Sequence, residues 1–187
     1  MTWTEYLKES LSPERVFRTQ RKYDLFIRKI LGACENTRET RIGDFGFGVG
    51  VIAKEVMQRL HRGAVFYLID NDPGVFKYAA KNLEPVKHLA IMEFVVGDIR
   101  ERLDLPFLDV AYGHGVLEHF TDAEIHKILD LQKQTARHII QYVPTDKYTT
   151  KSFGDERLLA IEYWRDTFKP TDVSLFNHGY DLILEWK

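Results

Sequence analysis

Short apolar runs alternate with amphipathic segments through most of this chain. A near-continuous apolar run, typical of a strand buried on both faces, lies at residues 64–69, and further strands are expected at residues 91–96, 108–112 and 138–143. Apolar positions at helical spacing lie at residues 49–60, 72–83 and 121–129. Gly63 is expected to end the first of these helices, and Thr121 to Glu124 has the spacing of a capping box. This alternation predicts a parallel sheet with helices on both faces.

The two ends of the chain carry their own patterns. A helix is expected over most of residues 13–31, started by Ser12-Pro13 and stopped by Gly32. Apart from one apolar stripe, the surface of this helix is strongly basic. We expect this basic surface to be a solvated face rather than a contact for a polyanion. Another helix is expected at residues 155–168. Strands at 173–176 and 180–186 flank the turn residues Asn177-His178-Gly179, which predicts a terminal antiparallel hairpin.

Composition narrows the class of protein. With 187 residues and 44% hydrophobic content, the chain suits one domain with a full core. A net charge of −2 gives no general attraction to nucleic acid or an anionic membrane. No apolar run approaches the roughly 20 residues of a membrane span, and the N-terminus does not resemble a signal peptide. We therefore expect a cytoplasmic protein. A single cysteine, Cys34, excludes an intrachain disulfide.

A glycine-rich turn joins the first expected strand to the helix after it. Asp44 is followed by Gly46, Gly48 and Gly50 at every second position. Glycine permits a sharp turn and lets a ligand approach the backbone closely. Free N–H groups at the start of the following helix favour a carboxylate or phosphate.

Two cofactors fit such a turn. Gly48 to Ala53 satisfies the G-x-G-x-x-G/A dinucleotide pattern, and Asp70 lies about 20 residues further on, where an acid binds a ribose hydroxyl. An NAD-binding oxidoreductase is therefore one interpretation. The position of Asp44 argues against NAD, because the pyrophosphate of NAD would meet an uncompensated negative charge there. An ammonium group would be favoured at the same place.

The pattern Asp44-x-Gly46-x-Gly48-x-Gly50 resembles motif I of the class I S-adenosylmethionine-dependent methyltransferases. The resemblance covers residues 40–187. It implies a Rossmann-like seven-stranded, mostly parallel sheet with a C-terminal antiparallel hairpin. Residues 1–39 would form an N-terminal helical segment of the same single domain, 1–187. In this family the glycine loop carries the cofactor's amino acid portion, and the acid helps to hold its amino group.

Three further segments carry the resemblance. Asp70, followed by Asn71, matches the acid that binds both ribose hydroxyls. Asp98, followed by Ile99, matches the acid that accepts from the adenine amino group. Val116-Leu117-Glu118-His119 matches a segment common in the small-molecule branch that includes the ubiquinone and menaquinone biosynthesis methyltransferases.

The resemblance implies methyl transfer from S-adenosylmethionine to a small-molecule acceptor. His114, which follows the fourth strand, is expected to line the site, and His114 or His119 is the candidate for removing an acceptor proton. No metal-ligand cluster is recognisable. Because only residues 144–154 lie between the fifth strand and the next expected helix, any cover is expected from residues 1–31, with Trp3, Tyr6 and Leu7 as apolar contacts. A methyltransferase-like binding subunit without turnover is a further alternative. The acceptor and the oligomeric state stay open.

Overall fold

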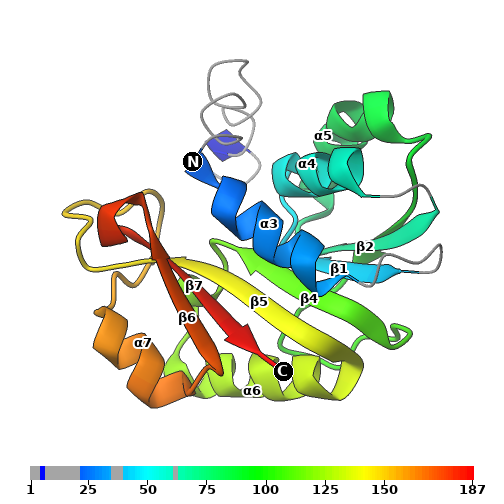
Figure 1. The fold of residues 1–187 in the computed structure, drawn as a ribbon. Coiled ribbons are helices and arrows are strands. Elements are labelled where there is room, and N and C mark those ends of the chain that lie inside the picture. Colours follow the sequence, from blue (N-terminus) through cyan, green and yellow to red (C-terminus); the bar gives the residue numbers. More distant parts are fainter. Residues whose placement is uncertain (1–4, 7–21, 35–39, 61–62) are drawn as a thin grey trace.

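One seven-stranded sheet organises the fold. A computed structural model describes residues 5–6, 22–34, 40–60 and 63–187 (Figure 1). The strand order is β3-β2-β1-β4-β5-β7-β6. The first five strands in this order are parallel, and β7 is antiparallel to both β5 and β6. The predicted fold class, a mostly parallel Rossmann-like sheet ending in an antiparallel hairpin, is confirmed.

The elements follow the predicted order along the chain. The strands are β1 Arg41–Phe45, β2 Ala64–Asp70, β3 Ala90–Val96, β4 Leu108–His114, β5 Ala136–Pro144, β6 Asp172–Phe176 and β7 Asp181–Trp186. The α-helices are α3 Asp24–Ala33, α4 Val51–Arg59, α5 Pro73–Leu83, α6 Asp122–Thr135 and α7 Ile161–Phe168. Short 3-10 turns are η1 Glu84–Val86, η2 Leu117–His119 and η3 Asn177–Gly179.

Helices cover both faces of the sheet, as Figure 1 shows, with α3, α4 and α5 on one face and α6 and α7 on the other. Each layer encloses its own apolar core. Phe26 of α3 and Phe66 of β2 belong to the first core, and Trp164 of α7 and Trp186 of β7 belong to the second. Burial on both faces explains the apolar runs of β2, β4 and β5, whereas β3, at the edge of the sheet, leaves Ile91, Phe94 and Val96 exposed. Among the described helices, none is long and apolar enough to cross a membrane.

The N-terminal helix differs from the expectation in extent. Residues 13–21 lie outside the described residues. Within the described part, α3 begins only at Asp24, because Tyr23 takes a non-helical backbone conformation. The predicted stop at Gly32 is wrong, since the helix runs on to Ala33 and ends at an extended Cys34. Gly32 has ordinary helical geometry here, so it lacks the left-handed conformation that ends helices at glycine.

Two other helix boundaries need correction. The helix predicted from residue 155 begins instead at Ile161, after Ala160 in an extended conformation. Before it, Leu159 forms an isolated parallel bridge to Thr145, the residue that follows β5. Helix α4 ends at Arg59, before the predicted end at Gly63. The capping box at the start of α6 is confirmed, with reciprocal bonds between Thr121 and Glu124.

Candidate active site

The glycine turn after β1 is tightly wound. Gly46, Gly48 and Gly50 have φ angles of 77°, 55° and 72°, in the left-handed region that favours glycine. A Cβ built on Gly46 would lie 2.6 Å from Cγ2 of Val116, so a side chain there would also collide with the segment after β4. Gly50 is the N-cap of α4. The predicted strand-turn-helix placement of the three glycines is therefore present.

Asp44 lies one residue before the end of β1 and is only 2% exposed. Its Oδ2 accepts a hydrogen bond from Oη of Tyr112 at 2.8 Å. Burial raises the pKa of Asp44 to about 8, and the nearby charge of Asp70 adds to this, whereas the bond from Tyr112 opposes it. A buried carboxyl of this kind favours a cationic ligand group, because such a group would compensate the charge.

A cavity of about 290 Å³ opens at the carboxyl ends of β1, β4 and β5. Asp44, Gly46 and Gly48 line one side of it. Further lining residues come from the N-terminal segment, from η2 and from the segment after β5: Tyr6, Lys22, Tyr23, Glu118, His119, Tyr148, Phe153 and Glu156. Open parallel sheets bind ligands at this edge, so the cavity is the candidate site.

Asp70 adjoins this cavity through the glycine turn. Its Oδ2 accepts from the backbone N–H of Gly48 at 3.0 Å, and its Oδ1 accepts from the N–H of Asp72 at 3.0 Å. Burial raises the pKa of Asp70, and these backbone bonds oppose the rise. Asn71 is exposed in the turn that follows. The carboxylate therefore lies at the end of β2, where the sequence predicted it, and its hydrogen bond from Gly48 stabilises the glycine turn.

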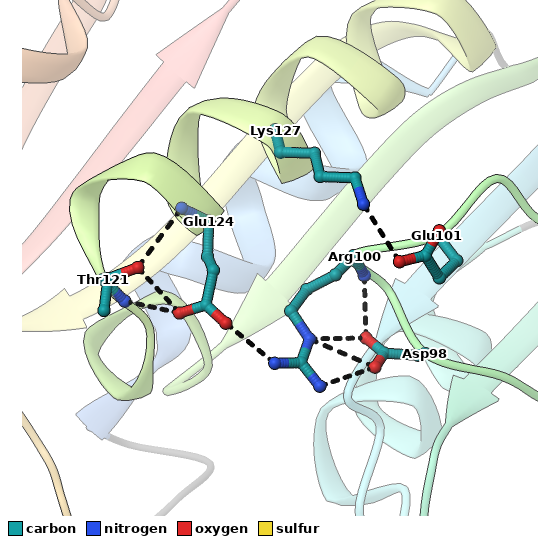
Figure 2. Close-up of polar contacts among 6 residues, drawn as sticks. All are labelled: Asp98, Arg100, Glu101, Thr121, Glu124 and Lys127. Atoms are coloured by element: carbon teal, nitrogen blue, oxygen red, sulfur yellow. Dashed lines mark hydrogen bonds and ion pairs between the residues drawn. The ribbon is translucent and has the colours of Figure 1, made fainter.

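Asp98 lies outside the cavity lining and is held by Arg100. The guanidinium of Arg100 donates to both carboxylate oxygens of Asp98, at distances from 2.7 to 3.1 Å. Its Nη1 donates to Glu124 of the α6 capping box at 2.7 Å, so Arg100 joins the loop after β3 to the start of α6 (Figure 2). Arg100 holds the pKa of Asp98 below its usual range. Any ligand at Asp98 therefore shares the carboxylate with Arg100.

Ile99 is turned away from the main cavity. It is buried in the core beneath α6 and lines a second, smaller cavity of about 50 Å³ with Phe45 and Leu103. The structure therefore does not bring Asp98 and Ile99 into the cavity that contains Asp44.

Both candidate histidines line the cavity. His114 ends β4 and stacks on Tyr142, with ring centroids 4.6 Å apart. Although the residue is partly exposed, its Nε2 atom is buried and has no partner among the described residues. Burial and the charge of Lys22 lower the pKa of His114 to about 3, so its ring is neutral. His119 follows in η2, and its Nδ1 lies 2.9 Å from Oδ1 of Asp155.

A polar cluster centred on Asp181 forms one wall of the cavity. Asp181 is fully buried on β7, and its Oδ1 accepts from the hydroxyl groups of Tyr142 and Tyr148, each at 2.8 Å. Lys22 lies 3.3 Å from its Oδ2 and donates to Tyr148 at 2.9 Å. The cluster therefore fixes three aromatic or cationic side chains from separate segments around one carboxylate.

The cover of the cavity differs from the expectation. Of the three apolar contacts predicted for residues 1–31, Tyr6 lines the cavity and stacks on Phe153 at 4.8 Å between centroids. Trp3 and Leu7 lie outside the described residues. The expectation that cover comes only from residues 1–31 is wrong, because Tyr148, Phe153 and Glu156 from the segment after β5 also line the cavity.

Two lining carboxylates were missed by the sequence interpretation of the site. Glu118 could have been found, because it lies in the Val116–His119 segment that carried the family resemblance. Its neighbour His119 was chosen instead as the candidate for removing an acceptor proton. Glu156 gave no signal, since it fell within a predicted helix. The described residues contain no group of three or more metal-ligating side chains.

Comparisons with known structures show the same fold. A methyltransferase from Aquifex aeolicus, described as S-adenosylmethionine-dependent, is 16% identical with a TM-score of 0.73, and the match covers 97% of this chain and 96% of that one. Magnesium protoporphyrin IX methyltransferase from Synechocystis, with bound S-adenosylhomocysteine, is 16% identical with a TM-score of 0.66, covering 89% and 81%. Human N-acetylserotonin methyltransferase, in complex with S-adenosylmethionine, is 18% identical with a TM-score of 0.66, and this chain spans only 56% of its length.

The sequence itself gives a family match. No curated protein matches the chain significantly. A family model for a methyltransferase domain, however, matches residues 43–137, just over half of the chain. This match favours the methyltransferase interpretation of the glycine turn over the dinucleotide one. The chain belongs to the methyltransferase domain family.

Proposed function

We propose that this protein transfers a methyl group from S-adenosylmethionine to a small-molecule acceptor. One observation carries the proposal: a single cavity joins the glycine turn and buried Asp44 to the ends of β4 and β5. Two of the similar structures hold S-adenosylmethionine or its demethylated product. The cavity therefore offers a donor side on the turn and an acceptor side beyond it.

The donor side fits the amino acid portion of this cofactor. The N–H groups of the turn suit its carboxylate, and Asp44 suits its ammonium group. Asp70 suits the ribose hydroxyls, because each of its oxygens accepts one backbone bond and keeps a second lone pair. We keep three further residues in the proposed site only because they follow the ends of β2 and β3: Asn71, Asp98 and Ile99. For Asp98, an adenine amino group would have to share the carboxylate with Arg100.

The acceptor side supplies alignment. When bound, the cofactor provides a methyl group already activated by its sulfonium. The chain's own task is to hold the acceptor in line and exclude water. Tyr23 and Tyr142 both pack on the ring of His114, Tyr23 in a T-shaped contact and Tyr142 stacked. His114 is neutral and presents a buried, unpartnered nitrogen, so it suits a hydrogen bond to the acceptor. His119 remains a proposed second site for a transferred proton.

Tyr6 and Phe153 form the proposed cover over the acceptor side. Because their stacked rings come from the N-terminal segment and from the segment after β5, deleting residues 1–11 removes half of this pair. We expect the truncated protein to keep its affinity for S-adenosylhomocysteine and to lose methyl transfer. An unchanged kcat/KM in a methyl-transfer assay would show that the N-terminal segment takes no part in holding the acceptor.

Calorimetry tests the cofactor assignment directly. Titration with S-adenosylmethionine should show binding, and titration with NAD should show none. Asp70→Asn keeps the size of the side chain but replaces one acceptor oxygen by a donor, so affinity should fall by at least tenfold. Asp104→Asn, at an exposed position, is the matched control. Tight NAD binding would refute the assignment.

A second assay addresses turnover. Release of S-adenosylhomocysteine from a donor with a labelled methyl group, in the presence of a metabolite extract, distinguishes an enzyme from a binding subunit that lacks turnover. Binding of the donor without any release of product would favour the binding subunit.

A further inference from the structure

Glu118 carries an unsatisfied acceptor into the cavity. The residue is 2% exposed, and its Oε2 is buried without a hydrogen-bond partner among the described residues. Its Oε1 lies 3.3 Å from the position that a Cβ on Gly115 would occupy, so the absence of a side chain at Gly115 makes room for the carboxylate. Buried acceptors of this kind are costly unless a ligand or another group donates to them.

A second carboxylate stands beside it. The backbone N–H of Arg157 donates to the carbonyl of Glu118 at 2.8 Å, which ties the segment after β5 to η2. The guanidinium of Arg157 strengthens this tie by donating to the carbonyl of Phe120 at 2.6 Å. Glu156 is thereby held next to η2, 5% exposed, with its Oε2 accepting from the N–H of Ser152 at 2.6 Å. Both carboxylates line the same cavity.

No described cation in the cavity lining is left to neutralise this pair. Lys22 is bound to Asp181 and Tyr148, the ring of His114 is neutral, and His119 is paired with Asp155 at 2.9 Å. Around the carboxylates, the lining is aromatic, with Tyr23, Tyr142 and Phe153 among its members. Aromatic faces attract cations, as carboxylates do. The acceptor side therefore complements a ligand that brings N–H donors and positive charge.

We propose that the methyl acceptor is an amine whose nitrogen is held between Glu118 and Glu156. This inference rests on the proposed methyltransferase function and specifies its substrate class. One proton is shared between the amine and Glu118. Burial, together with the charge of Glu156, raises the pKa of Glu118 well above its usual value, which favours the proton on the carboxyl group and leaves the nitrogen lone pair free.

The proposed step balances as follows. With the proton on Glu118, the neutral amine nitrogen attacks the methyl carbon and forms the N–C bond. The S–C bond breaks with its electron pair left on sulfur, so the positive charge of the sulfonium passes to the methylated nitrogen. The new ammonium lies beside the carboxylate of Glu156, which stabilises it, and Glu118 releases its proton to solvent when the product leaves.

Three probes with one carbon skeleton test the substrate class: 2-phenylethylamine, 2-phenylethanol and phenylacetate. Each is tested against protein saturated with S-adenosylhomocysteine, by thermal shift, and then with a donor carrying a labelled methyl group. We expect only the amine to stabilise the protein and to take up label. Preference for the alcohol or the acid, or no binding of the amine to protein that binds S-adenosylhomocysteine, would overturn the proposal and leave the proposed function standing.

Substitutions assign the effect to the two carboxylates. Glu118→Gln and Glu156→Gln should each lower kcat/KM for 2-phenylethylamine at least tenfold and weaken the preference for the amine over the alcohol, while affinity for S-adenosylhomocysteine stays within twofold. Glu162→Gln, exposed on α7, is the matched control. Unchanged selectivity in both variants would refute the role of the pair. Failure of the parent protein to bind S-adenosylhomocysteine would overturn both this inference and the proposed function.

Discussion

Replacing Asp44 by asparagine tests the electrostatics of the donor side. In the folded protein, burial raises the pKa of Asp44 to about 8, whereas the unfolded chain has the ordinary value of 3.8. Because the folded value is the higher one, the folded state binds this proton more tightly. The stabilising contribution is fully present below pH 4 and is lost as the pH rises through 8. Asparagine is neutral throughout and can still accept the bond from Tyr112.

The size of the effect follows from the two pKa values. At pH 7 the folded protein retains a proton that the unfolded chain has released. At about 1.36 kcal/mol for each pH unit above 3.8, the free energy of unfolding at pH 7 falls by about 4 kcal/mol, which is an upper limit. Asp44→Asn avoids this loss. Its stability relative to the parent should therefore rise by about 1 kcal/mol per pH unit between pH 5 and pH 8 and then level off.

Urea unfolding at several pH values measures this slope, with the fluorescence of buried Trp164 and Trp186 as the signal. Asp104→Asn controls for the chemical change at an exposed position. The reasoning is refuted if the Asp44→Asn difference stays constant from pH 5 to pH 8, because Asp44 would then be ionised in the fold. The same variant should lose affinity for S-adenosylmethionine. In the parent, binding near pH 7 should release a proton, seen as a dependence of the calorimetric enthalpy on the buffer.

Three other substitutions give independent predictions. Gly32→Ala should raise the free energy of unfolding by about 0.5–1 kcal/mol, because a Cβ there meets nothing within 4 Å in helix α3; a destabilised variant in urea unfolding would contradict this. Gly48→Val should abolish cofactor binding in calorimetry with little change in circular dichroism. Gly154→Val is the matched control, because Gly154 also has a positive φ, 64°, but lies outside the cavity; this variant should bind the cofactor normally. Arg100→Ala should strengthen cofactor binding several-fold by freeing Asp98, and weaker binding would show instead that Arg100 positions Asp98.

The fold could be predicted because its signals are local. The parallel strands β2, β4 and β5 lie inside the sheet and are mostly buried, so they appear as largely apolar runs, and the turn residues between runs mark the connections. Asp72 and Thr121 cap the helices that they were expected to start. The glycine turn is equally local, since its three positive φ angles require glycine whatever lies around them. These features need no knowledge of distant contacts.

Boundaries that depend on distant contacts were not predictable. Residues 155–160 have a helix-compatible sequence, but tertiary contacts keep them out of a helix. Leu159 pairs with Thr145, and Arg157 donates from its backbone to Glu118. Each of these bonds satisfies a backbone group that a helix would otherwise have used. Local propensity therefore gave way to pairing with segments that lie 14 and 39 residues away in sequence.

The acidic character of the cavity arises from the same contacts. Glu118 alone reads as one polar residue in a short turn, and Glu156 alone reads as a solvated position on a helix. The bonds that Arg157 makes to the carbonyls of Glu118 and Phe120 bring the two carboxylates to one cavity. Their electrostatic effect then depends on burial, which the sequence does not encode at either position. The proposed donor side therefore depends mainly on the local glycine motif after β1, whereas the proposed acceptor chemistry depends on the packing of the segment after β5 on η2.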